Sequence, residues 1–83
     1  MIKTKRKPNS VGEILLKEFM SPKNTSVSDL AKLMGVEQSV VEGICNDKID
    51  LTEETAYMLS QAFKTSTKFW LNIQNRTKLW NKI

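Results

Sequence analysis

The stretch from Val27 to Asn46, VSDLAKLMGVEQSVVEGICN, most constrains the fold of this chain. Apolar residues recur at intervals of three and four on both sides of Gly35, which indicates two short helices joined by a turn. Gly35 can take the left-handed conformation that ends the first helix, and Ala31 leaves room for the second helix to cross. The residues expected to face the core here and just beyond are Leu30, Ala31, Leu33, Met34, Val36, Val41, Ile44, Ile49 and Leu51.

This pattern predicts a helix-turn-helix, in which a second, polar helix is held on a small body and enters the major groove of DNA. The alternative is two amphipathic helices that pack in an ordinary bundle and use the same apolar residues.

Helix signals also account for most of the remaining chain. Ser10 and Glu13 form a capping-box pattern ahead of an apolar helical repeat that ends near Met20. Further helices are expected to start after the caps Ser26, Thr52 and Ser66. Residues 1–9 have no helical or strand period and are expected to form a flexible basic arm, while residues 10–83 form one domain. The predicted fold is therefore all-α, with five helices and a central helix-turn-helix.

The residue content excludes several classes of protein. The chain has a single cysteine, Cys45, and no histidine, so we expect neither a disulfide scaffold nor a metal site, and Cys45 to be a small buried residue. Without histidine it lacks the commonest general base, and it has no glycine-rich phosphate loop, so we expect neither an enzyme nor a cofactor. It shows neither a signal peptide nor a membrane helix. We expect a cytoplasmic protein that binds no membrane and no small-molecule ligand.

The net charge of +4 is unevenly distributed along the chain. Residues 1–23 carry six bases and two acids, residues 24–63 carry two bases and seven acids, and residues 64–83 carry five bases and no acid. The predicted DNA-reading segment is therefore acidic and lies between two basic ends. Because Lys and Arg contacts to phosphate supply most of the salt-dependent affinity for DNA, we expect the ends to supply that affinity. The arm residues expected to contact phosphate are Lys5, Arg6 and Lys7; the alternative is that the arm is a solvated tail that contacts no DNA.

The last predicted helix carries more apolar surface than a small body lined by four other helices is expected to bury. Phe69, Trp70, Ile73 and Trp80 recur at helical spacing, and Leu79 lies beside them. Surplus aromatic surface on a terminal helix favours a homodimer interface made of these five residues. The alternative is that this helix covers the core of its own chain.

Four segments together resemble the HigA (VapI-type) antitoxins, which belong to the Xre, lambda-repressor-like group of helix-turn-helix proteins. These segments are SVGEILLKEFM, VSDLAKLMGVEQSVVEGICN, LTEETAYMLSQAF and TSTKFWLNIQNRTKLW. The resemblance implies an all-helical dimer that represses its own operon and binds and neutralises a toxin similar to the RelE-type ribonucleases. It implies that operator bases are read by Glu37, Gln38, Ser39, Val40, Glu42 and Gly43. It implies phosphate contacts from Ser26, Ser28, Asn46 and Lys48.

The chain departs from the family pattern at three places. The recognition helix begins with Glu37-Gln38-Ser39 and has no basic residue there. The turn after it is Asn46-Asp47 instead of the frequent Asn-Gly. Ser10-Val11, instead of His-Pro, precedes the first Gly-Glu. The first departure bears on affinity for DNA. Two other functions therefore stay open: a stand-alone Xre-family repressor with no toxin partner, and a protein-interaction domain that has lost DNA binding.

Overall fold

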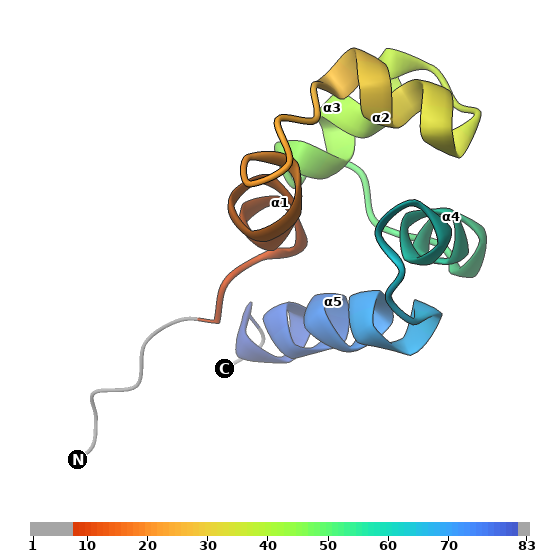
Figure 1. Cartoon of the computed structure of the whole chain (residues 1–83). Coiled ribbons are helices and arrows are strands. Elements are labelled where there is room, and N and C mark those ends of the chain that lie inside the picture. Colours follow the sequence, from red (N-terminus) through yellow and green to blue (C-terminus); the bar gives the residue numbers. More distant parts are fainter. Residues whose placement is uncertain (1–7, 82–83) are drawn as a thin grey trace.

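The computed structural model describes residues 8–81, which form an all-α fold. Its elements are α1 (Val11–Ile14), which continues as the π-helix η1 (Leu15–Met20), and then α2 (Val27–Met34), α3 (Gln38–Cys45), α4 (Glu53–Phe63) and α5 (Thr67–Asn81). Figure 1 shows α2 and α3 together at one end of the molecule, α5 at the other end, and α1 and α4 between them. The predicted five-helix fold with a central helix-turn-helix is confirmed, counting α1 and η1 as one helix. In this part of the chain no helix is both long and apolar enough to cross a membrane.

The helices begin at the side chains that the sequence predicts as caps. Each of these side chains accepts a hydrogen bond from the backbone amide three residues later, at 3.0–3.2 Å; they are Ser10, Ser26, Thr52 and Ser66. At the first helix the Glu13 carboxylate also accepts from the backbone amide of Ser10, which completes the predicted capping box. These bonds satisfy amides that have no partner inside the helix.

The first helix changes its geometry after one turn. It is α-helical over α1 and becomes a π-helix over η1, where the amide of Ser21 donates to the carbonyl of Leu16 at 2.9 Å. The helix ends at Met20, as the following Ser-Pro pair predicts. Within these wider turns Leu15 and Met20 are buried, and Phe19 reaches the aromatic rings of α4 and α5.

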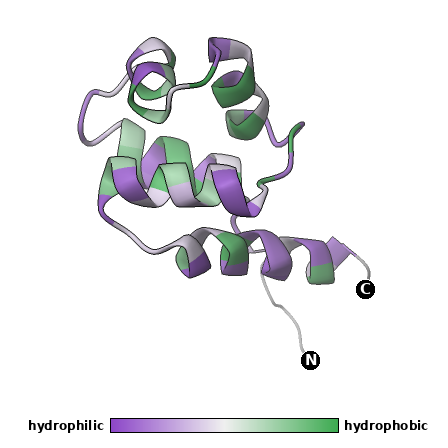
Figure 2. Cartoon of the chain, turned by 90° about the vertical axis from the view of Figure 1, so that its right-hand side faces the viewer, coloured by the Kyte–Doolittle hydropathy of each residue, from purple (hydrophilic) through white to green (hydrophobic). Residues whose placement is uncertain are grey.

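All of the helices contribute to one core. Figure 2 shows hydrophobic and hydrophilic stretches alternating along each helix, as expected where each helix buries one face. Fourteen apolar residues are buried: Val11, Leu15, Met20, Leu30, Ala31, Met34, Val41, Ile44, Leu51, Ala56, Leu59, Phe63, Trp70 and Ile73. The ring of Phe19 lies 5.2 Å from that of Phe63 and 5.0 Å from that of Trp70, which joins the first helix to α4 and α5.

Two residues expected in the core are exposed. Leu33 is 65% exposed and Ile49 is 42% exposed. At about 100° per residue, the buried side of α2 is centred between Leu30, Ala31 and Met34, and Leu33 projects roughly 110° away from that centre. Ile49 lies over Gly43 rather than inside the core. Helical spacing alone therefore placed Leu33 in the core, although its side chain lies beside the buried face of α2.

Cys45 is half-buried and contacts Met20 through sulfur, with 3.8 Å between Sγ and Sδ. Burial, followed by the carboxylates of Asp47 and Glu42, raises the pKa of its thiol. The thiol is therefore kept neutral, which fits the expectation of a small packing residue rather than a nucleophile.

Candidate nucleic-acid interface

The turn between α2 and α3 has the geometry that its sequence predicts. Gly35 ends α2 in the left-handed region, with φ of 74°. Its amide and that of Val36 both donate to the carbonyl of Ala31, at 2.8 and 3.0 Å, so the chain leaves α2 within one residue. Glu37 is then extended and caps α3 with its backbone alone. Two hydrogen-bonded helix ends thus fix the angle between α2 and α3.

One face of α3 lies in the core and the opposite face is exposed. Val41 and Ile44 are 0% and 1% exposed, so they fix the rotation of the helix about its axis. Gln38, Ser39 and Glu42 project from the other side and are exposed. Within residues 8–81 the side chains of Gln38 and Ser39 make no hydrogen bond. Their donors and acceptors are therefore available to an external partner.

The structure narrows the set of residues predicted to read bases. Glu37, Gln38, Ser39 and Glu42 are exposed together at the start and outer face of α3. Val40 instead packs against the core with part of its surface. Gly43 is covered by the side chain of Ile49, and its carbonyl accepts from the amides of Lys48 and Ile49. Neither Val40 nor Gly43 presents a free side of the helix, because each lies where α3 meets other parts of the chain.

The predicted phosphate contacts lie at several helix ends. Ser26 caps α2, and its oxygen accepts from the amide of Asp29, which leaves the hydroxyl proton free to donate. Ser28 is half-buried in the first turn of α2. Asn46 and Lys48 are exposed beyond the end of α3. The other predicted phosphate contacts lie outside the described residues: Lys5, Arg6 and Lys7.

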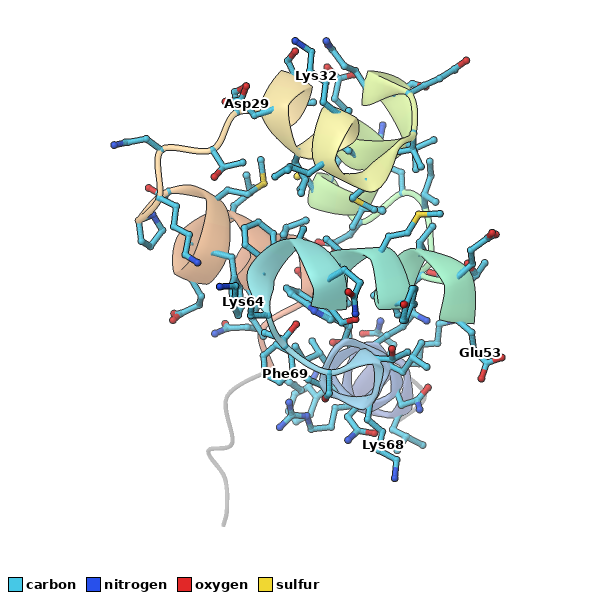
Figure 3. All side chains as sticks on the ribbon, turned by 45° about the vertical axis from the view of Figure 1, so that its right-hand side comes forward. Asp29, Lys32, Glu53, Lys64, Lys68 and Phe69 are labelled. Carbon is cyan, nitrogen blue, oxygen red and sulfur yellow. The ribbon has the colours of Figure 1, made fainter. Side chains whose placement is uncertain are left out.

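The negative charge near the recognition helix is not compensated by Lys68 and Lys78 of α5. Figure 3 shows Asp29 and Lys32 at one end of the molecule, Lys68 at the opposite end, and Lys64, which ends α4, between them. On the same helix as Lys68, Lys78 is paired with Asp50 at 2.7 Å. These two lysines of α5 therefore offer little positive charge to a ligand on α3. The described residues contain no group of three His, Cys, Asp or Glu side chains able to hold a metal ion.

Two residues hold the segment after α3 through bonds that the sequence did not predict. The side-chain amide of Gln74, on α5, accepts from the amide of Leu51 at 2.6 Å and donates to its carbonyl at 3.0 Å. Asp47, just after α3, accepts at 2.6 Å from the Ser10 hydroxyl and at 2.9 Å from the Gly12 amide. The segment that leaves the recognition helix is thus held by α5 on one side and by α1 on the other. The sequence marked Asp47 only as a departure from the family pattern, and it placed Gln74 within TSTKFWLNIQNRTKLW, one of the segments of the family resemblance.

The predicted dimer interface needs a correction. Trp70 and Ile73 are 0% and 2% exposed inside their own chain, so their side chains are not available to a second subunit. They are buried because η1 and α4 supply Phe19 and Phe63 to the same cluster. Of the five predicted residues, the accessible ones are Phe69 at 38%, Leu79 at 64%, and the half-buried Trp80. Phe69 and Leu79 also line a shallow hollow on the outer side of α5, together with Asn72, Asn75 and Arg76.

Known proteins share this fold and much of this sequence. Residues 16–70 match the family model described as Helix-turn-helix. The chain is 42% identical to the antitoxin HigA-1 of Vibrio cholerae over 98% of this chain and 76% of that protein. It is 43% identical to an uncharacterized HTH-type transcriptional regulator of Haemophilus influenzae over 92% of this chain and 71% of that protein. The structure of the Pseudomonas aeruginosa antitoxin HigA with the higBA promoter has a TM-score of 0.86 at 31% identity, covering 90% of this chain and 82% of that one. The chain belongs to the HigA-type, Xre-like family of helix-turn-helix proteins.

Proposed function

We propose that this chain is the antitoxin of a type II toxin–antitoxin module. It binds operator DNA as a homodimer, represses its own operon, and neutralises a RelE-like ribonuclease toxin. The observation that carries the DNA-binding part is the exposed polar face of α3, on which Gln38 and Ser39 have no hydrogen-bond partner among residues 8–81. The Pseudomonas aeruginosa relative solved with the higBA promoter supports DNA binding by this chain.

The exposed groups on α3 are suited to base edges in the major groove. The Gln38 amide can pair with N6 and N7 of adenine through two hydrogen bonds, and the Ser39 hydroxyl can donate or accept. The Glu37 and Glu42 carboxylates can accept from N4 of cytosine, although each also repels phosphate. Sequence choice therefore depends on Gln38 and Ser39, while the two acids disfavour binding to DNA in general.

Contacts to phosphate have to come from groups around α3 rather than from α3 itself. The amides at the start of α2 and the Ser26 hydroxyl are placed to donate, and Lys48 supplies a positive charge beyond the end of α3. The three arm residues Lys5, Arg6 and Lys7 supply the remainder. Because these contacts are electrostatic and displace counterions, binding is salt-dependent.

Replacing Gln38 with alanine is expected to reduce selectivity without removing binding. Loss of a two-bond contact to a base costs about 1–3 kcal/mol of discrimination, which is about 5-fold to 150-fold in the ratio of operator to non-operator affinity. Fluorescence anisotropy on DNA from upstream of the gene, at constant salt, measures that ratio.

The matched control is Gln61→Ala, which removes the same exposed side chain from α4 and should leave the ratio unchanged. Equal effects of the two substitutions would contradict a reading role for Gln38. Absence of binding by the unmodified protein at low salt, with and without toxin, would remove the repressor role altogether.

The dimer is proposed to form through the outer side of α5, using Phe69, Leu79 and Trp80. Leu79 and Phe69 expose 64% and 38% of their surface in the single chain, which leaves apolar area on this side of α5 for a second subunit. A homodimer presents two recognition helices and therefore suits a palindromic operator.

Toxin neutralisation is proposed from the name of the Vibrio cholerae relative and from the charge of the chain. Ribonucleases that hold RNA are basic, and residues 24–63 together with Glu18 offer an acidic folded surface. Co-expression with the protein encoded beside this gene is expected to give a complex that co-purifies and has lost ribonuclease activity. A neighbouring product that neither co-purifies nor is inhibited would contradict the antitoxin role.

The second candidate function is a stand-alone repressor, which the name of the Haemophilus influenzae relative favours. It uses the same α3 contacts and needs no toxin. A short basic protein encoded next to this gene distinguishes the antitoxin from this alternative.

A further inference from the structure

We infer that Asp47 is a positioning residue for DNA recognition: its carboxylate fixes the recognition helix α3 against the start of α1. The inference rests on the proposed DNA-binding function, because it assigns Asp47 a role in how selectively α3 reads bases. It concerns a position whose φ of 60° favours glycine and at which this chain has an acid.

Both carboxylate oxygens of Asp47 bind groups at the start of α1. One oxygen accepts from the Ser10 hydroxyl at 2.6 Å and the other from the Gly12 amide at 2.9 Å. Hydrogen bonds to an ionised acceptor are stronger than those between neutral groups. The negative charge also lies at the positive end of the first helix, where it is favourable. The side chain therefore makes a specific contact between segments 35–37 residues apart.

The backbone of Asp47 moves with α3. Its amide donates to the carbonyl of Ile44 at 3.1 Å, and the next amide, that of Lys48, donates to Gly43 at 2.8 Å. Asp47 has φ of 60°, a left-handed conformation that glycine takes without steric cost. The turn alone would thus favour glycine. The two bonds to α1 supply a reason for aspartate at this position.

Gly12 brings α1 and α3 into direct backbone contact. A methyl group at Gly12 would overlap the carbonyl of Cys45, the last residue of α3. With no side chain between the two backbones, the angle of α3 depends on this contact and on the Asp47 bonds beside it. The packing of Val41 and Ile44 fixes rotation about the helix axis, whereas the contact at Gly12 and Asp47 fixes the tilt.

A small tilt of α3 is enough to disturb base reading. The eight residues of α3 span about 12 Å at roughly 1.5 Å per residue. A tilt of about 10° at the Asp47 end would move Gln38, at the far end, by about 2 Å, beyond the tolerance of a direct hydrogen bond. Phosphate contacts from the start of α2 and from the arm do not depend on this tilt. Loss of the Asp47 bonds should therefore lower selectivity and leave salt dependence unchanged.

The test compares Asp47→Gly, which keeps the turn and removes both bonds, with Asp47→Asn, which tolerates the turn and keeps one neutral acceptor oxygen. The ratio of affinities for operator and for a shuffled sequence of the same length is expected to fall about tenfold in Asp47→Gly and less in Asp47→Asn. The ratio is the correct readout, because removal of one negative charge raises affinity for both DNAs. Both substitutions remove the same charge, so the slope of log affinity against log salt should be the same in the two variants.

Lys64→Gly is the matched control, since Lys64 ends α4 with φ of 57° and lies outside the helix-turn-helix and its contact with α1. This substitution relieves a similar left-handed backbone conformation and should leave the ratio of operator to shuffled-DNA affinity unchanged. Hydrogen exchange of the Gly12 amide, followed by NMR without DNA, is expected to be faster in Asp47→Gly, with shift changes that extend along α3 to Gln38. An unchanged ratio or unchanged shifts at Gln38 in a folded Asp47→Gly or Asp47→Asn variant would overturn the inference. Failure of the unmodified protein to bind operator would instead contradict the proposed function.

Discussion

Replacement of Trp70 with alanine is expected to lower the free energy of unfolding by about 3–5 kcal/mol. Trp70 is 0% exposed, and its ring lies 5.0 Å from Phe19 and 5.1 Å from Phe69. Its indole Nε1 donates to the Thr65 hydroxyl at 2.7 Å, so the substitution also removes the partner of a part-buried polar group. Small domains have net stabilities of about 5–15 kcal/mol, so the variant loses a large part of its total. Urea denaturation followed by circular dichroism measures the change.

Two further variants identify the cause of the Trp70 effect. Trp70→Phe keeps the aromatic contacts and loses the bond to Thr65, so its cost should be smaller, at about 1–2 kcal/mol. Leu79→Ala removes a side chain that is 64% exposed, and it should change protomer stability by less than about 0.5 kcal/mol. Because Trp70 is enclosed by its own chain, its effect should be the same at low and high protein concentration. A Trp70 effect that vanishes at high concentration would restore this residue to the dimer interface.

The sequence predicts the helix α5 correctly, but it predicts the surface that the apolar side of α5 contacts only in part. Spacing shows that Trp70 and Ile73 share an apolar side, but it does not show whether that side meets the same chain or a second one. The answer depends on η1, whose π-helical turns carry Phe19 to Trp70 and Phe63. No residue pattern in this segment distinguishes a π-helix from an α-helix, because both bury residues at similar intervals.

The candidate interface is likewise predicted from the sequence only in part. The exposure of Ser39 and Glu42 follows from helical period, since Val41 and Ile44 point to the opposite side, whereas Gln38 lies beside that buried face in the first turn of α3. Caps such as Ser26 follow from local chemistry over three residues. Asp47 and Gln74 could not be found in this way, because their bonds join residues 23–37 positions apart. Local signals thus predict the recognition helix and not what fixes its tilt.

Because basic residues of α5 lie away from α3 or are paired, the arm has to supply a larger share of the proposed affinity for DNA than the sequence alone indicated. The sequence allowed both basic ends to contact phosphate. Figure 3 shows Lys68 at the end of the molecule opposite Asp29 and Lys32, with Lys64 between them, and Lys78 is paired with Asp50. Residues 24–63 contain only two bases, Lys32 and Lys48, against seven acids. The arm joins α1 at Ser10, whose hydroxyl donates to Asp47 just after α3, while Thr77 of α5 donates to the carbonyl of Asn9 at 3.4 Å. The last residue of the arm is therefore held where α1, α5 and the segment after α3 meet.

Deletion of residues 1–7 is therefore expected to cause the largest loss of DNA binding. It removes the three predicted phosphate contacts Lys5, Arg6 and Lys7 from each subunit, or six from a dimer. At about 0.9 of slope per contact, log affinity plotted against log salt should become less steep by about 5. The advantage of the full chain over the deletion should then be about a thousandfold larger at 50 mM salt than at 200 mM salt. Anisotropy titrations across a salt series measure both quantities.

Selectivity gives an independent check on the same deletion. Phosphate contacts carry no sequence information, so the ratio of operator to shuffled-DNA affinity should change far less than either affinity, in contrast to Asp47→Gly and Gln38→Ala. A double substitution of Lys64 and Lys68 with glutamine removes two charges per subunit from the end of α4 and the first turn of α5, outside the helix-turn-helix, and should leave the salt slope of the full chain unaltered. If the deletion leaves the slope as it was and the double substitution reduces it, phosphate contact belongs to the α4–α5 end and DNA must approach a different face of the protein. That outcome would also remove α3 from the interface, because one duplex cannot follow α3 and the opposite end of the molecule at once.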